Sequence, residues 1–256
     1  MKLFWELGLL VLSIGSYVIT GFYAPWLVWI SLVPILYLTY HVSFRKMIIY
    51  SVIFGIVTPA WLFYWIAYYD FATYFACLAL VASFYGLWPI ISTILIKKIK
   101  HPLAIVVPPI IWSTLQFLYH FSIINSFWAN VGIYAPMLAP LTWLIKGYGV
   151  AFLILLSNSL VLFYLIKKKK KYLFTWGILG IVVLACFAFI NLAQPKGEAL
   201  RIAIVQPNIE ESFEWRGNHS DELISHYESQ IRSITQKPSL IVLPEYAFAT
   251  NIQNTA

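Results

Sequence analysis

Charged residues are scarce in this chain, and their scarcity excludes an ordinary soluble protein. Asp, Glu, Lys and Arg make up 11% of the 256 residues, whereas globular domains hold about 25%. Hydrophobic residues reach 61% and aromatic residues 18%, and Trp and Tyr gather at the interfaces of membrane proteins. The composition therefore indicates a polytopic membrane protein.

Cysteine is nearly absent as well. Cys77 and Cys186 are the only two, and both lie in long apolar runs, so they offer neither a disulfide framework nor a metal-ligand spacing. A buried Cys behaves mostly as a small hydrophobe. His219 and His226 have no third ligand near them in the sequence, so we expect no metal and no other cofactor.

Acidic residues are almost missing from the first three quarters of the chain, which holds only Glu6 and Asp70. Both lie near the ends of apolar runs, so no buried proton relay of a transporter is visible. The basic residues give a net charge of +7 and mostly stand at the ends of apolar runs. They do not lie on a soluble face studded with aromatic residues, and this placement argues against nucleic-acid binding.

Seven apolar segments are long enough, or nearly so, to cross about 30 Å of hydrocarbon, which takes about 20 helical residues. The first follows Lys2 as a signal peptide would, but no small-x-small cleavage site follows at residues 20–25, so a retained helix is favoured. Proline residues are expected to kink the second, third and fourth segments. The predicted spans are residues 3–19, 22–40, 47–69, 71–96, 102–119, 147–166 and 172–192.

The charge of the loops predicts the orientation. Lys2 and the basic groups at residues 45–46, 97–100 and 167–171 fall on one side if every segment crosses, and the intervening loops hold no Lys or Arg. Lys146 opens the sixth segment and can reach the interface. The positive-inside rule puts the basic loops in the cytoplasm, so seven crossings deliver the C-terminal part to the extracytoplasmic side.

Residues 122–140 form a connection that lacks charge and is rich in aromatic and apolar side chains, among them Phe127 and Trp128. This composition fits a segment that lies in the outer interface or dips into the membrane. It fits equally well a segment that packs on neighbouring helices. The sequence leaves both open.

The composition changes abruptly near Gln194, and we therefore divide the chain into a multi-span membrane domain, residues 1–193, and a second domain, residues 194–256. Residues 201–205 and 240–243 predict two strands, and the apolar spacing of residues 223, 227, 231 and 234 predicts a helix between them. Such a βαβ unit pairs its strands in parallel. Two strands and one helix bury too little surface to fold well alone, which indicates an incomplete α/β domain.

The residues that follow the two strands carry a family resemblance. Gln206, Pro207 and Asn208 come after the first strand, Glu214-Trp215 follows, and the second strand runs into Leu243-Pro244-Glu245. With the apolar segments before them, these residues resemble the apolipoprotein N-acyltransferases of bacterial envelopes. The resemblance implies a polytopic α-helical membrane domain of about seven spans, followed by the N-terminal part of an extracytoplasmic, nitrilase-like αββα domain. It also implies a multi-pass protein of the bacterial inner membrane.

The activity that the resemblance implies is a two-step acyl transfer. A membrane phospholipid is the acyl donor, and the α-amino group of a lipoprotein's diacylglyceryl-cysteine is the acceptor. The family uses a Glu–Lys–Cys set, in which Glu245 matches the Glu that acts as general base. By resemblance to an aromatic loop near the lipid entrance, Phe127 and Trp128 would guide acyl chains, although anchoring at the interface explains them equally well.

The same comparison implies that the other two catalytic residues lie beyond Ala256. Lys237 precedes Glu245, and both Cys77 and Cys186 lie in predicted spans, so none of them matches the catalytic Lys or Cys. Removing the nucleophile removes covalent catalysis, so we expect the 256 residues alone to be inactive. The chain would then be a truncated or split product, completed by a possible second chain. The alternative is a non-catalytic membrane scaffold from this family that binds lipid or a partner.

Overall fold

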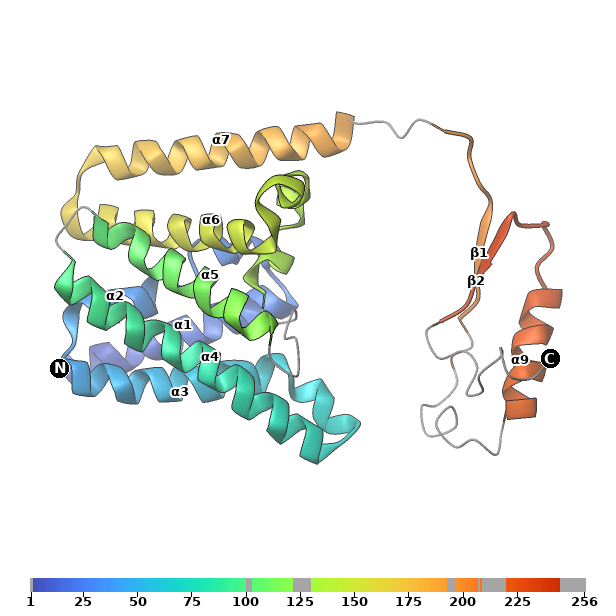
Figure 1. Ribbon diagram of the computed structural model, residues 1–256, viewed down its shortest axis with the longest axis horizontal. Helices are drawn as coiled ribbons and strands as arrows, with labels where there is room; N and C mark the ends of the chain where they lie inside the picture. The colour runs from blue at the N-terminus through green and yellow to red at the C-terminus, as the bar shows by residue number, and fades with distance from the viewer. Residues whose placement is uncertain are drawn as a thin grey trace. The chain divides into compact units, whose positions relative to one another are not determined.

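The computed structural model describes residues 2–99, 103–121, 130–192, 197–206, 208 and 220–244. The chain divides into two compact units, residues 1–193 and residues 194–256. The first unit is a bundle of helices, and the second contains a small α/β arrangement (Figure 1).

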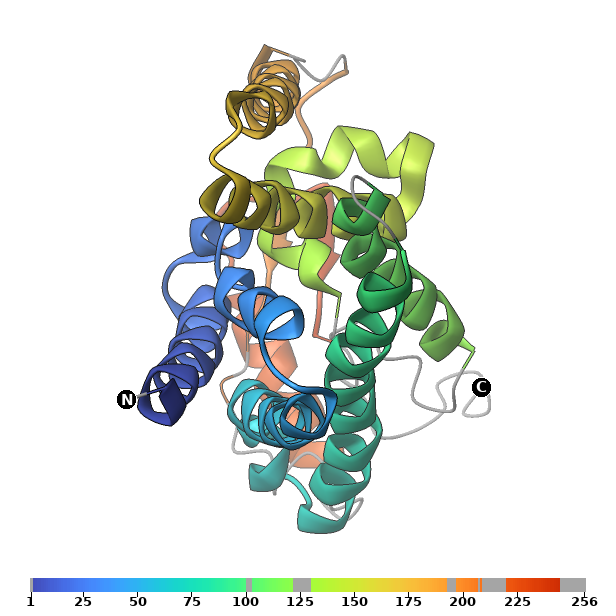
Figure 2. The same cartoon turned by 90° about the vertical axis from the view of Figure 1, so that its left-hand side faces the viewer.

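Six helical segments of the described residues are long and apolar enough to cross a membrane. They lie side by side in the first unit, with α7 at its edge beside α6 (Figures 1 and 2). The protein is thus mostly helical and fits a multi-pass membrane protein. The spanning segments are formed by α1 (Lys2–Phe22), α3 (Phe44–Leu62), α4 (Phe71–Lys98), α5 (Val107–His120) with the preceding turn η3 (Leu103–Val106), α6 (Ala139–Lys167) and α7 (Lys170–Leu192).

The predicted second span, residues 22–40, was expected to be one helix kinked by Pro34, and the expectation of a single helix was wrong. The chain instead forms a 3₁₀ turn, η1 (Pro25–Trp29), and then a short helix, α2 (Val33–His41). Pro34 lies in the first turn of α2, where it begins a helix rather than kinking one. Because α2 has 9 residues, it rises only about 13 Å and cannot cross the hydrocarbon alone.

Side chains of α6 satisfy the backbone groups that this break exposes. The amide nitrogen of Asn158 donates to the carbonyl oxygen of Val28 at 2.9 Å, and its amide oxygen accepts from the backbone N–H of Leu32 at 2.9 Å. The hydroxyl of Ser157 donates to the carbonyl oxygen of Trp29 at 2.9 Å. Irregular backbone is tolerated at membrane depth only where protein groups satisfy it in this way.

The broken segment nevertheless carries the chain back across the bundle. The Lys46 ammonium lies 2.6 Å from a carboxylate oxygen of Glu6, and the Tyr50 hydroxyl donates to the same oxygen at 2.8 Å. These contacts place the starts of α1 and α3 at the same end of the bundle. The chain that leaves the far end of α1 must therefore return through η1 and α2 before α3 begins.

The helix ends that carry basic residues gather at this same end, which we call the basic end and define by Lys46, Lys97 and Lys167. The Lys97 ammonium lies 3.4 Å from the carbonyl oxygen of Val42, just after α2. The Tyr40 hydroxyl of α2 donates to the carbonyl oxygen of Ala104 at 3.1 Å, which places the start of α5 there too. Figure 1 shows the N-terminus and the α2–α3 and α6–α7 connections at this end, on the left.

The connection before α6 packs on its neighbours where it is described. The turns η5 (Val131–Tyr134) and η6 (Pro136–Leu138) bury Val131 and Leu138 in the core of the bundle. Lys146 then breaks α6 with φ 57° and ψ −178°. The break coincides with the predicted start of the sixth span at residue 147.

Close helix packing and an aromatic cluster form the core. An added Cβ at Gly55 of α3 would lie 2.7 Å from the carbonyl oxygen of Ala82 and 2.8 Å from the backbone nitrogen of Gly86, both in α4. Small residues permit this approach, as is common between membrane helices. In the same core, the rings of Tyr17, Tyr85, Trp88 and Trp112 are fully buried, and several meet edge to face.

The second unit confirms the predicted pairing of its strands. β1 (Ile202–Ile204) and β2 (Leu240–Val242) form a parallel two-stranded sheet, joined in register from Ile202↔Leu240 to Ile204↔Val242. Helix α9 (Ser220–Arg232) lies between them in the sequence. Its Leu223 and Tyr227 are buried against Val205, with Leu243 packed beside them. The amphipathic spacing seen in the sequence thus marks the face of α9 that packs.

Candidate functional site: an apolar groove beside α7

The three residues singled out from the sequence, Glu245, Phe127 and Trp128, all lie outside the described residues. The structure does describe the approach to Glu245. Leu243 and Pro244 follow β2, and Val205 and Gln206 follow β1. Because the strands are parallel, these two segments leave the same edge of the sheet.

One face of this sheet is uncovered in the described part of the second unit. Ile202 and Ile204 of β1 are exposed, and so are their partners Leu240 and Val242 on β2. The register places these four side chains on one face, since residues two apart in a strand point the same way. An apolar sheet face of this kind is normally covered by a second layer.

The two cysteines lie in the membrane unit. Cys77 is in α4 and is partly buried, whereas Cys186 is in α7 and is buried. Both pack with the hydrophobic core of the bundle. No group of three His, Cys, Asp or Glu that could hold a metal ion occurs among the described residues.

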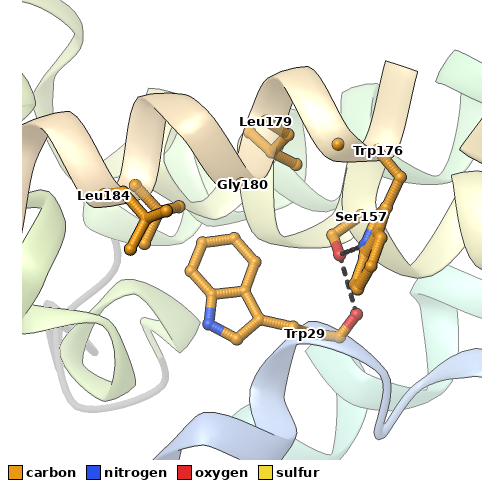
Figure 3. Close-up of a pocket in the computed structure, with 8 residues that line it drawn as sticks. Trp29, Ser157, Trp176, Leu179, Gly180 and Leu184 are labelled. Atoms are coloured by element: carbon orange, nitrogen blue, oxygen red, sulfur yellow. Dashed lines mark hydrogen bonds between the residues drawn. The ribbon is translucent and has the colours of Figure 1, made fainter. Parts of the chain in front are cut away.

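The first unit contains an apolar groove, which we call the α7 groove. It has a volume of about 300 Å³ and lies where α7 meets α6 and η1 (Figure 3). The indole of Trp29 lies across it, and Leu184 and Trp176 stand near its two ends (Figure 3). The lining residues are Trp29, Ser157, Trp176, Gly177, Leu179, Gly180, Val183 and Leu184.

Two glycines and the loose contact of α7 keep the groove open. A Cβ added at Gly177 or Gly180 would meet no atom within 4 Å, so this side of α7 has room for another group. Among the six described spanning segments, α7 is also the least buried. The space beside it is therefore accessible from the hydrocarbon region of a membrane.

The hydroxyl of Ser157, the polar group of the groove, already has hydrogen-bond partners within the protein. The Ser157 hydroxyl donates to the Trp29 carbonyl oxygen at 2.9 Å and accepts from the Trp176 indole N–H at 2.8 Å (Figure 3). No acid, Lys, His or Cys is among the described residues that line the groove, so none of them could act as a base on Ser157. The groove suits a hydrocarbon chain.

Comparison with known proteins decides the family. Residues 8–160 match the model of the apolipoprotein N-acyltransferase N-terminal domain, which is more than half of the chain. The chain belongs to the apolipoprotein N-acyltransferase family. The matched region runs from α1 into α6 and so includes the broken second span and Ser157.

Three apolipoprotein N-acyltransferases illustrate the similarity. The protein of Geobacter metallireducens is 27% identical over 245 residues, covering 86% of this chain and 47% of the relative. The protein of Nitrosomonas europaea is 28% identical over 144 residues, covering 54% and 28%. The protein of Haemophilus ducreyi is 25% identical over 179 residues, covering 66% and 34%. The chain thus matches less than half the length of each relative.

Similarity to the family is not confined to the membrane unit. The match with the Geobacter metallireducens acyltransferase covers 86% of this chain, whereas the first unit ends at residue 193 of 256. The similarity must therefore extend into the second unit. Sequence reasoning found the family but missed the α7 groove, because residues 29, 157 and 176–184 meet only in the folded bundle.

Proposed function

We propose that this chain supplies the membrane unit and the start of the catalytic domain of an apolipoprotein N-acyltransferase. The reaction would move an acyl chain from a phospholipid to the α-amino group of a lipoprotein's N-terminal diacylglyceryl-cysteine. The observation that carries this proposal is the family match over residues 8–160.

The basic end supports an orientation for this enzyme. Cytoplasmic ends of membrane proteins are rich in Lys and Arg, so the basic end would face the cytoplasm of a bacterial inner membrane. Helix α7 starts with Lys170 at that end and runs to Leu192. The chain would therefore leave the membrane on the extracytoplasmic side, where Glu245 would meet its substrates.

Acyl transfer by this family type needs a nucleophile, a base and a positive charge. Glu245 would take the proton of a Cys thiol, whose thiolate attacks the ester carbonyl carbon of the phospholipid. A Lys would stabilise the oxyanion, and the lysophospholipid alcohol would leave with a proton returned by Glu245. The lipoprotein amine would then attack the thioester and release the thiol.

The 256 residues alone would not complete this cycle, in our proposal. Glu245 is their only match to the catalytic set, and Cys77 and Cys186 both lie in membrane helices. The uncovered sheet face of the second unit supports an α/β domain that further chain or a second chain completes. The α7 groove would hold one hydrocarbon chain of a lipid.

A chimera tests the proposal. The 256 residues would be joined to the remainder of the Geobacter metallireducens acyltransferase, purified, and supplied with phospholipid and a diacylglyceryl-cysteine peptide. Mass spectrometry of the peptide would report the added acyl chain. We expect transfer by the chimera, none by the 256 residues, and none by the chimera with Glu245→Gln.

Glu228→Gln is the matched control, because Glu228 is an exposed acid on α9 that contacts Arg232. This variant should stay active. A covalent acyl-enzyme on the 256 residues alone would overturn their proposed inactivity. A monodisperse, folded chimera without activity would favour the alternative, a non-catalytic membrane scaffold.

A further inference from the structure

The membrane unit carries positive charge that its own acids do not balance. Residues 1–193 contain 12 Lys and Arg residues but only Glu6 and Asp70 as acids. Glu6 is already paired with Lys46, and Asp70 caps the start of α4, the helix whose other end carries Lys97. The remaining charge at the basic end must therefore be balanced by groups from outside the membrane unit.

A cavity lies among these charges, and we call it the basic-end cavity. Its volume is about 360 Å³, and the ends of α2, α4 and α6 surround it together with η3. Lys97 and Lys167 line it from α4 and α6, and His41 lines it from α2. All three residues are exposed, so their polar groups can reach a ligand from the aqueous side.

The basic side chains of the cavity have N–H donors that are free to bind a ligand. The Lys97 ammonium approaches the Val42 carbonyl oxygen at 3.4 Å, which occupies one of its three N–H groups. Neither Lys97 nor Lys167 pairs with an acid in the described part of the chain. The His41 ring is stacked on Tyr37 at 3.9 Å and is held by a hydrogen bond from its Nδ1 to the Tyr37 carbonyl oxygen.

The wall of the cavity is apolar. Ile96 and Phe163 are buried, and Ile166 is partly buried beside them. Phe163 meets the ring of Tyr40 edge to face at 5.4 Å, which fixes the wall between α2 and α6. A ligand that fits must therefore offer an anionic group to the lysines and hydrocarbon to the wall.

We propose that the basic-end cavity binds an anionic phospholipid, with its phosphate between Lys97 and Lys167 and its glycerol and upper acyl carbons on the apolar wall. Basic pockets between membrane helices on the cytoplasmic side bind such head groups. A zwitterionic lipid such as phosphatidylethanolamine is disfavoured because its ammonium would add a positive charge beside the lysines. This lipid site shares no lining residue with the α7 groove.

Native mass spectrometry of the full 256-residue chain in detergent tests the site. The chain would be offered equal amounts of phosphatidylglycerol and phosphatidylethanolamine, and we expect selective retention of phosphatidylglycerol. The double variant Lys97→Gln, Lys167→Gln should lower that retention by about fivefold or more, since each Lys near a membrane surface contributes to anionic lipid binding.

The control variant is Lys169→Gln, Lys170→Gln, which removes the same charge from the start of α7 without touching the cavity lining. It should retain phosphatidylglycerol as the unchanged chain does. Equal loss in both double variants would overturn the site and leave only a diffuse attraction to the basic end. If the unchanged chain retained both lipids equally, that result alone would overturn the proposed site.

A competition experiment with a head group that lacks acyl chains distinguishes a phospholipid ligand from a soluble phosphate ester. Glycerophosphoglycerol at the same concentration should not displace phosphatidylglycerol, because it cannot contact Ile96, Phe163 and Ile166. Efficient displacement would overturn the phospholipid and point to a soluble phosphate compound. The melting temperature of each variant in detergent would confirm that the comparison is made on folded protein.

Discussion

Asn158 is the residue on which the broken second span most depends. It contacts Val28 and Leu32 from α6, and it is fully buried. Asn158→Leu would leave a carbonyl and an N–H of the break without partners, and each such buried group costs about 1–3 kcal/mol. We expect the variant to unfold about 2 kcal/mol more easily, as measured by denaturation in detergent.

Asn191→Leu provides the control for that prediction. Asn191 is exposed on α7 and donates to the Phe187 carbonyl oxygen within its own helix. Its replacement should leave stability nearly unchanged. If both variants were equally stable, the amide of Asn158 would not be what holds the break.

Asp70 gives the membrane unit a dependence on pH. Hydrogen bonds from Thr73, including the one from its backbone N–H to the carboxylate, lower the pKa of Asp70 below its ordinary value of 3.8. Because the pKa of Asp70 is lower in the folded chain than in the unfolded chain, its carboxylate stabilises the fold fully at pH values above the unfolded-state pKa. This stabilisation is lost as the pH falls through the folded-state pKa. We expect the melting temperature to fall in this acidic range partly because the cap is protonated.

The variant Asp70→Asn distinguishes the effect of protonating Asp70 from the effect of protonating other acidic residues. Asn caps a helix about as well as Asp and carries no proton to gain, so the variant should lose less stability between pH 5 and the acidic limit. Asp70→Ala should be less stable at every pH, because the cap is gone. Identical pH profiles for the unchanged chain and Asp70→Asn would show that this carboxylate does not contribute.

At the scale of elements, α3 and α4 pack so closely at Gly55 that the contact leaves no room for a side chain. Gly55→Ala would press a Cβ onto the backbone of Ala82 and Gly86. Overpacking costs about 1–3 kcal/mol, and the better helix propensity of Ala returns up to about 1 kcal/mol. We therefore expect a net loss of about 1 kcal/mol in the free energy of unfolding in detergent.

Gly15→Ala on α1 is the matched control. Its added Cβ meets nothing within 4 Å, so only the helix propensity changes and stability should hold or rise slightly. A stabilised Gly55→Ala variant would mean that α3 and α4 can separate without cost, which would contradict the packing described above.

Element boundaries also show where sequence reasoning succeeds and fails. The long apolar segments and the start of the sixth span near residue 147 were predictable, because hydrophobic length and a basic residue at a span's end are local signals. The break at residues 23–32 was not, because an apolar run has the same composition whether it is one helix or two pieces. What decides it is Asn158, which lies more than 120 residues away and supplies the missing hydrogen bonds.

At the scale of the whole molecule, local motifs carried the resemblance to the family, while the sites depend on tertiary contacts. The strands β1 and β2, the helix α9 between them and the parallel pairing of the two strands follow from short-range patterns. The α7 groove and the basic-end cavity each join residues from three or more elements. The spacing of residues along the chain does not predict such contacts, so they can be identified only in the folded bundle.

We predict that the number of membrane crossings exceeds the number of continuous spanning helices, and this prediction can be tested. Six continuous helices alone would return the chain to the side where it began. The ion pair of Lys46 with Glu6 places the starts of α1 and α3 at the same end of the bundle, so we predict that the broken segment crosses too and that the chain makes seven crossings. Asp70 and the second unit should then lie on the side opposite to Lys168.

Cysteine labelling in intact cells distinguishes the two arrangements. In a background with Cys77→Ala and Cys186→Ala, we expect an impermeant maleimide to reach Asp70→Cys and Glu228→Cys from the extracytoplasmic side. Lys168→Cys should be labelled only after lysis. With six crossings and the same N-terminal orientation the pattern would invert, because every segment after α1 would change sides. Labelling of Lys168→Cys in intact cells would thus contradict the crossing by η1 and α2, and with it the extracytoplasmic placement of Glu245.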